Sequence, residues 1–246
     1  MIVEADRKTS KDQDGRESET REKQVTINHQ TLTQFPILAA LDDDARQKVA
    51  SYFHERTFPP GQTIALEGEH CGKVYFVIRG VVRVYRLSRE GREQVLARLG
   101  PGEAFNFVPA LDGGPGRASV DALTKVTLYA MPCERFRRIA REHQEVALAV
   151  AEHLAAQVRR LSDMVESLAL HTIRARLARF LLAQAEGVQQ PSHRWTQAEI
   201  AAHIGTVREM VGRTLRAFGA AGLIRRQGGQ IVVVDREGLE QETVDA

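Results

Sequence analysis

The fold of this chain is decided by the stretch WTQAEIAAHIGTVREMVGRTLRAFGAAGLIRRQGGQIVVVD, which runs from Trp195 to Asp235. Thr196 and Glu199 have the spacing of a capping box and predict the start of a short helix. Gly205 follows that helix and predicts a sharp turn, because glycine tolerates backbone angles that other residues avoid. A second helix is expected over residues 207–220, so the order is helix, turn, helix.

The second helix is expected to begin after Thr206, whose side chain can cap it. Its apolar residues recur at helical spacing and predict a buried face made of Val207, Val211, Leu215 and Phe218. The opposite face is predicted to meet DNA and carries Arg208, Glu209, Gly212, Arg213 and Arg216. A charged helix behind a short capped helix suits insertion into a DNA major groove.

A basic hairpin is predicted after this helix, which Gly222 is expected to end. The glycine-containing turn over residues 227–230 separates two short strand-forming runs. Arg225 in the hairpin and Arg174 in an upstream helix are expected to contact phosphates. Surface arginines that are merely solvated would look similar, but here the glycine turn, the charged face and the hairpin coincide. The stretch therefore predicts a winged helix-turn-helix that binds DNA.

Short strand-forming runs separated by glycines occupy residues 58–132. A turn every 8–12 residues or so, as here, predicts a small antiparallel barrel or sandwich. A long connection over residues 106–117 interrupts the series, and its glycine amides together with Arg117 would suit an anionic ligand. The expected fold class is α+β, with an antiparallel β-roll, a long helix and the winged helix-turn-helix.

Apolar residues recur at alternating spacings of four and three within a helix predicted from Glu145 to Leu170. We interpret this seam as a parallel two-stranded coiled coil, which predicts a homodimer with two recognition helices. An amphipathic helix packed only on its own barrel is the alternative, and it needs a wider apolar stripe. The residues expected in the dimer contact are Leu154, Val158, Leu161, Val165 and Leu168; those expected to touch the barrel are Leu148, Val150 and Met164.

Length and composition are those of a globular protein with two domains, since 246 residues include 43% apolar and 27% charged side chains. No apolar run approaches the roughly 20 residues that span a bilayer, and no export signal is apparent, so a cytoplasmic protein without a membrane partner is expected. Cys71 and Cys133 lack CxxC spacing, which argues against a zinc site. The expected division is a disordered extension (1–28), an effector-sensing roll (29–143), a dimerisation helix (144–170) and a DNA-binding domain (171–246).

The roll, the long helix and the winged helix together resemble the CRP/FNR family of bacterial transcription regulators. The resemblance is carried by Arg208-Glu209-x-x-Gly212-Arg213 and by the spacing of Gly61, Gly68 and Gly80, followed by Pro101-Gly102-Glu103. It implies an effector site between the roll and the long helix, a homodimer on a palindromic operator, and RNA polymerase as a partner. In the family, a helix of this Arg-Glu-x-x-Gly-Arg type reads a TGTGA-like half-site, so an inverted repeat of that type is expected.

The resemblance also indicates where an effector would bind: Asn106, Phe107, Arg117, Ala118, Ser119, Leu161 and Ser162. Members that respond to cyclic AMP carry Gly-Glu where this chain has Asn106-Phe107, and Arg-Ser where it has Arg117-Ala118. The ring of Phe107 cannot accept hydrogen bonds from ribose hydroxyls, and each buried hydroxyl left unpaired costs roughly 1–3 kcal/mol. Cyclic AMP is therefore not the expected effector.

Other ligands and functions remain as alternatives. An iron–sulfur cluster is not expected, because the cysteines that family members use for it are missing from residues 1–70. Haem is possible, since His54, His70 or Cys71 could ligate its iron, as in a gas-sensing regulator. A cyclic-nucleotide-binding regulatory subunit of a partner enzyme would explain the roll but not the winged helix. No HExxH, GxSxG or Walker sequence is present, so the chain itself is not expected to be an enzyme.

Overall fold

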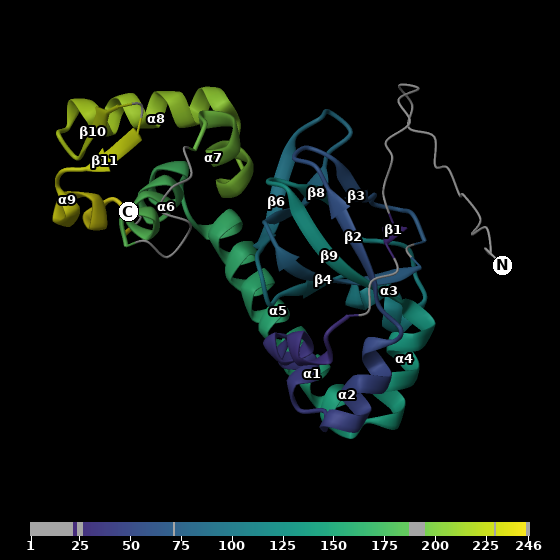
Figure 1. Cartoon of the computed structure of the whole chain (residues 1–246). Coiled ribbons are helices and arrows are strands. Elements are labelled where there is room, and N and C mark those ends of the chain that lie inside the picture. The colour runs from purple at the N-terminus through teal and green to yellow at the C-terminus, as the bar shows by residue number, and fades with distance from the viewer. Residues whose placement is uncertain (1–21, 24–26, 71, 187–194, 229, 245–246) are drawn as a thin grey trace.

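Two antiparallel sheets form the N-terminal half of this computed structural model, which describes residues 22–23, 27–70, 72–186, 195–228 and 230–244 (Figure 1). The first sheet has the strand order β1-β2-β9-β4-β7 and the second has the order β3-β8-β5-β6. The strands are β1 (Glu22–Lys23), β2 (His54–Phe58), β3 (Thr63–Ala65), β4 (Lys73–Arg79), β5 (Val82–Leu87), β6 (Glu93–Leu99), β7 (Ala104–Phe105), β8 (Ser119–Ala122) and β9 (Val126–Pro132).

The two sheets share an apolar core to which both contribute alternate residues, including Val77, Val82, Leu99, Val120 and Leu128. The turns between strands depend on glycines with positive φ, as at Gly61, Gly68 and Gly80. A Cβ at Gly80 would also collide with the carbonyl oxygen of Lys125, so this turn admits no side chain. The predicted antiparallel roll is therefore confirmed.

Two features of the roll differ from expectation. Strands β2 and β7 were not predicted, since the first lacks clear alternation and the second has two residues. The connection expected over 106–117 contains the helix α3 (Phe107–Asp112). Asn106 takes a left-handed conformation (φ 75°) that starts this helix, and Phe107 and Ala110 bury one side of it. An irregular loop was thus the wrong prediction for the first half of the connection.

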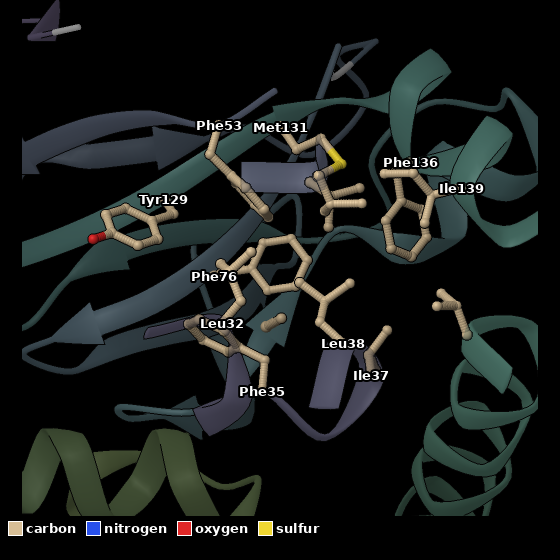
Figure 2. Close-up of a cluster of buried hydrophobic side chains, with 14 of the residues drawn as sticks. Leu32, Phe35, Ile37, Leu38, Phe53, Phe76, Tyr129, Met131, Phe136 and Ile139 are labelled. Carbon is tan, nitrogen blue, oxygen red and sulfur yellow. The ribbon is translucent and has the colours of Figure 1, made fainter. Parts of the chain in front are cut away.

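Helices close one end of the roll around a second apolar core, which Figure 2 shows. Phe35 and Phe53 each meet the ring of Phe76 edge-on at 5.1 Å, and Phe136 lies fully buried beside them. The helices that contribute are η1 (His29–Gln34), α1 (Pro36–Ala39), α2 (Asp43–Ala50), α4 (Cys133–Glu142) and the first turns of α5 (Gln144–Leu170). In Figure 1 they gather around the lower end of α5.

The expectation of a disordered extension over 1–28 falls mostly outside the described residues. Within them, Glu22–Lys23 form β1 against β2, and Ile27 is buried in the second core. Order therefore begins before residue 29, because the apolar side chain of Ile27 has a place in that core.

The long helix is confirmed as α5, and it spans the seam that the sequence predicts. Val146 and Val150 are buried against the roll domain, as expected for Val150. Leu148 is 60% exposed, which corrects the expectation that it touches the barrel.

The C-terminal part is a winged helix-turn-helix with a core of its own, centred on Leu177, Ile200 and Phe218. Its elements are α6 (Ile173–Ala185), α7 (Gln197–Ile204), α8 (Arg208–Ala220), β10 (Ile224–Gln227), β11 (Gln230–Val233) and α9 (Arg236–Gln241). Helix α9 was not predicted, although Leu239 at its centre is fully buried. Among the described residues, no helix combines the length and the apolar character needed to cross a membrane.

Candidate DNA-binding surface and effector region

The turn between α7 and α8 is held by local capping. The hydroxyl of Thr196 accepts from the Glu199 main-chain N–H at 3.2 Å, and the Glu199 carboxylate accepts from the Thr196 N–H at 2.8 Å. Gly205 ends α7 in a left-handed conformation (φ 71°). Arg176 of α6 then donates to the carbonyl oxygen of Ile204 at 2.6 Å, which satisfies an acceptor that the helix end leaves open.

Helix α8 begins one residue later than predicted, and this changes the role of Thr206. Val207 is the N-cap residue, and no side chain caps the helix. The N–H of Thr206 donates instead to the carbonyl of Ala201 at 2.9 Å, within the turn. The prediction that Thr206 caps α8 is therefore wrong, because the glycine turn takes up this residue.

The described structure exposes four of the predicted DNA-facing side chains along α8: Arg208, Glu209, Arg213 and Arg216. Gly212 differs from them, because it is buried where α8 crosses α7. A Cβ at Gly212 would lie 3.1 Å from Oε1 of Gln197. This corrects the expectation that Gly212 lies on the open face, and it gives the glycine a packing role.

The two residues expected at phosphates have different surroundings. Arg225 is exposed on β10, opposite Val232 of β11. Arg174 pairs with Glu242 near the C-terminus, with Nε 2.8 Å from the carboxylate, and lies over the ring of Phe218. Of the two arginines, Arg225 is thus the more accessible to a DNA phosphate.

His203 of α7 is enclosed by aromatic rings and a cation. It lies 5.2 Å from the ring of Phe180 and 5.5 Å from that of Trp195. Burial, assisted by the charge of Arg98, lowers the pKa of His203 to about 4. The imidazole is therefore neutral at neutral pH.

We expect this histidine to make folding weaker in mild acid. Between pH 6.5 and 4, His203 is protonated in the unfolded chain but stays neutral in the folded protein, because its pKa falls from 6.5 to about 4 on folding. The free energy of unfolding therefore falls as pH falls. Between pH 7 and pH 5 the loss should reach about 2 kcal/mol. Denaturant titrations of the wild-type and His203→Gln proteins at both pH values measure it. An equal pH effect in both proteins would contradict this prediction.

The residues expected to bind an effector come from the start of α3, from the segment that leads into β8, and from α5. Asn106 donates from its side-chain amide to the carbonyl of Lys73 at 3.0 Å. Phe107 is 2% exposed and packs its ring against Phe136 at 5.3 Å and against His153 of α5 at 5.1 Å. Phe107 thus connects the roll to α5 by apolar contact. A carboxylate in the same position would instead offer hydrogen-bond acceptors.

The other expected effector residues are more open. Arg117 is exposed and Ala118 is half-buried, just before β8. Ser119 is buried, and its hydroxyl accepts from the main-chain N–H of Glu67 at 3.1 Å. Leu161 and Ser162 lie exposed on α5. Arg117 is therefore the cation of this set that a ligand from solvent can reach.

Two of the three candidate haem ligands lie within the described residues. His54 is half-buried in β2 and His70 is exposed, while Cys71 lies outside the described residues. Among the residues that the structure does describe, no group of three or more His, Cys, Asp and Glu side chains could hold a metal ion. Haem iron takes only one or two ligands from the protein, so this finding concerns metal ions that side chains alone would hold.

The predicted coiled-coil seam lies mainly in solvent in the single chain. Leu154 is half-buried and packs on the second core. The exposed fractions of the following seam residues are 62% for Val158, 47% for Leu161, 66% for Val165 and 41% for Leu168. Val158, Leu161 and Val165 thus follow one another along α5 as large exposed apolar side chains, whereas Leu168 also lies against the turn after α7, where a Cβ built on Gly205 would collide with its side chain.

Known proteins match both halves of this architecture. The sequence model of the cyclic nucleotide-binding domain matches residues 55–143, and that of the Crp-like helix-turn-helix domain matches residues 175–242. A CRP-like cAMP-activated global transcriptional regulator of Mycobacterium tuberculosis is 31% identical over 189 residues, covering 74% of this chain and 84% of the relative. The chain belongs to the CRP/FNR family of transcription regulators.

Other members of the CRP/FNR family support this assignment. The cyclic AMP receptor protein of Thermus thermophilus is 32% identical over 206 residues, covering 84% of this chain and 95% of the relative. The crystal structure of a crp/fnr regulator from Eubacterium rectale has a TM-score of 0.74 at 24% identity, covering 86% of this chain and 99% of that one, and shows the shared fold. This chain is accordingly a transcription regulator whose helix-turn-helix binds DNA.

Proposed function

We propose that this regulator acts as a homodimer, reads a TGTGA-like inverted repeat, and responds to an effector held between the roll and α5. The observation that carries the proposal is the open arrangement of Arg208, Glu209 and Arg213 in the first half of α8. Arginine fits the O6/N7 edge of guanine, and glutamate accepts from the amino group of cytosine. The domain division expected from the sequence, with sensing over 29–143 and DNA binding over 171–246, belongs to this proposal.

The apolar seam of α5 supports the dimer. Surface runs of large apolar side chains favour association, and a second copy of the same helix offers a matching seam. A twofold dimer would place two recognition helices about one turn of DNA apart, roughly 34–36 Å between half-site centres. RNA polymerase is the partner that such a regulator would act on, once it is bound at a promoter.

The effector we propose is an anion other than cyclic AMP. The relatives that are named for cyclic AMP share only about a third of their residues with this chain. Here Phe107 is buried among rings and offers no acceptor for ribose hydroxyls, and Ala118 offers no hydroxyl for a cyclic phosphate. Arg117 is exposed and would hold an anionic group.

Selection from a pool of random duplexes, with and without cyclic AMP, tests the proposal. The bound fraction should converge on an inverted repeat of TGTGA type in both arms, since cyclic AMP is expected to have no site. Calorimetric titration of the purified protein with cyclic AMP should likewise give no heat of binding. A selected site without twofold symmetry would contradict the proposal that the protein reads an inverted repeat. Micromolar binding of cyclic AMP would contradict the proposal that the effector is another anion.

A further inference from the structure

The DNA-reading domain packs directly against the roll. Ala202 of α7 shares a buried cluster with Tyr85 of β5 and Val95 of β6. The side-chain amide of Gln94 donates to the main-chain carbonyl of His203 at 3.4 Å. In Figure 1, α7 accordingly lies beside β6. The two domains thus touch through β5, β6 and α7, in addition to the contact of Leu168 of α5 with the turn at Gly205.

Arg98 of β6 joins the two domains by two interactions. Its guanidinium lies 3.7 Å from the centroid of the Trp195 ring, and it pairs with the Glu199 carboxylate at 3.7 Å. Only 13% of the Arg98 side chain is exposed, so water weakens these interactions little. One residue of the roll therefore contacts both Trp195, which precedes α7, and Glu199 in the first turn of that helix.

The charges of the second sheet direct Arg98 toward α7. Arg98 stands opposite Arg83 across strands β5 and β6, and like charges in such a pair repel. Arg83 is neutralised within the roll by Glu93 at 2.7 Å and by Asp121 at 3.0 Å. The carboxylate that pairs with Arg98 comes instead from the DNA-reading domain. Among these ion pairs, Arg98 thus gains a carboxylate partner of its own only when that domain is docked.

The covalent connection leaves the angle between the domains open. Helix α5 ends at Leu170 and α6 begins at Ile173, with His171 in an extended conformation between them (φ −114°, ψ 139°). Such a link is not a rigid rod, so the direction of α8 relative to α5 depends on contacts such as that between β6 and α7.

We propose that Arg98 is a positioning residue for DNA reading. By holding Trp195 and Glu199, it keeps α8 at one angle to the roll, so that both recognition helices of the dimer meet their half-sites together. This inference rests on the proposed dimeric function. Ordering both helices before binding removes an entropic cost that would otherwise be met on the DNA.

Fluorescence reports the contact itself, because Trp195 is the one tryptophan of the 246-residue sequence. In the Arg98→Ala and Arg98→Gln proteins, the Trp195 indole should lose the guanidinium that lies over its ring and become more exposed to solvent. Quenching of its fluorescence by acrylamide should therefore increase. Arg86→Ala is the matched control, because Arg86 is an exposed arginine of β5 that pairs with Glu67. Quenching in this control should equal that of the wild type.

DNA binding separates positioning from mere stability. For each protein, affinity is measured on the full inverted repeat, on a single half-site, and on repeats with altered half-site spacing. In the Arg98 variants, affinity for the full repeat should fall about tenfold, while half-site affinity stays within about twofold of wild type. Discrimination against wrong spacings should weaken as well, because the reading helices are no longer held at one angle.

An equal loss on full and half-site duplexes, or unchanged full-site affinity and spacing preference, would overturn the role of Arg98. Unchanged quenching in both Arg98 variants would overturn the contact on which that role depends. If the wild-type protein shows no preference for the repeat over the half-site, the proposed dimeric function fails instead, and quenching still decides whether Arg98 covers Trp195.

Discussion

Replacement of Leu161 by lysine is expected to convert the proposed dimer into monomers. Leu161 lies 47% exposed in the middle of the α5 seam, between Val158 and Val165. In a parallel coiled coil the two new ammonium groups would face each other and would replace an apolar contact. Truncating one buried leucine already costs about 2–5 kcal/mol, so two such losses should raise the dissociation constant at least 100-fold.

Sedimentation at micromolar concentration measures this change. Ala156→Lys is the matched control, because Ala156 is an exposed residue of the same helix that lies off the seam. It adds the same charge and should leave the dimer intact. Specific DNA affinity should fall sharply in Leu161→Lys only, because the second half-site no longer binds within the same molecule. A dimeric Leu161→Lys protein would rule out the coiled-coil interface.

Replacement of Arg213 by alanine is expected to relax the reading of one base pair. Arg213 is exposed on α8 one turn beyond Arg208 and Glu209, where its guanidinium could bind a guanine edge in two places. Loss of such a contact costs about 1–3 kcal/mol, or roughly 5- to 150-fold in affinity for the selected site. The selection repeated with this variant should lose preference at one guanine of each half-site.

Arg225→Ala provides the comparison, since Arg225 is exposed on the wing. Loss of Arg225 should lower the affinity for all DNA sequences alike and reduce the dependence of binding on salt, because the Arg225 side chain is expected to contact a phosphate. An Arg213→Ala protein with unchanged base preference would contradict the assignment of α8 as the reading helix.

The helix-turn-helix was predictable because its signals are local. Thr196 and Glu199 satisfy each other in a capping box, and the N–H of Gly205 donates back to Ala201, so the signals that begin and end α7 lie within one helix. The same holds for the seam of α5, whose periodicity lies in one helix. The roll was predictable from its turns, where glycines such as Gly80 occupy positions that exclude a side chain.

The errors occurred where a neighbour in space decides the outcome. Gly212 belongs to the helical pattern of a DNA-facing surface, but Gln197 of the crossing helix lies against it. Leu148 belongs to an apolar stripe, but the roll does not extend to cover it. At Phe107 the prediction that no carboxylate is available stands, and the structure adds that the ring packs on Phe136 and on His153 of α5.

Sequence alone determined that this protein has a strand-rich roll, one long helix with an apolar seam, and a basic winged helix-turn-helix. Those features follow from capping, turn and periodicity rules that act over a few residues. Tertiary structure alone decided that Arg98 meets Trp195 and Glu199, and that Arg174 pairs with Glu242. Partners so distant in the chain leave no local pattern, because only folding brings their charges and rings within a few ångströms.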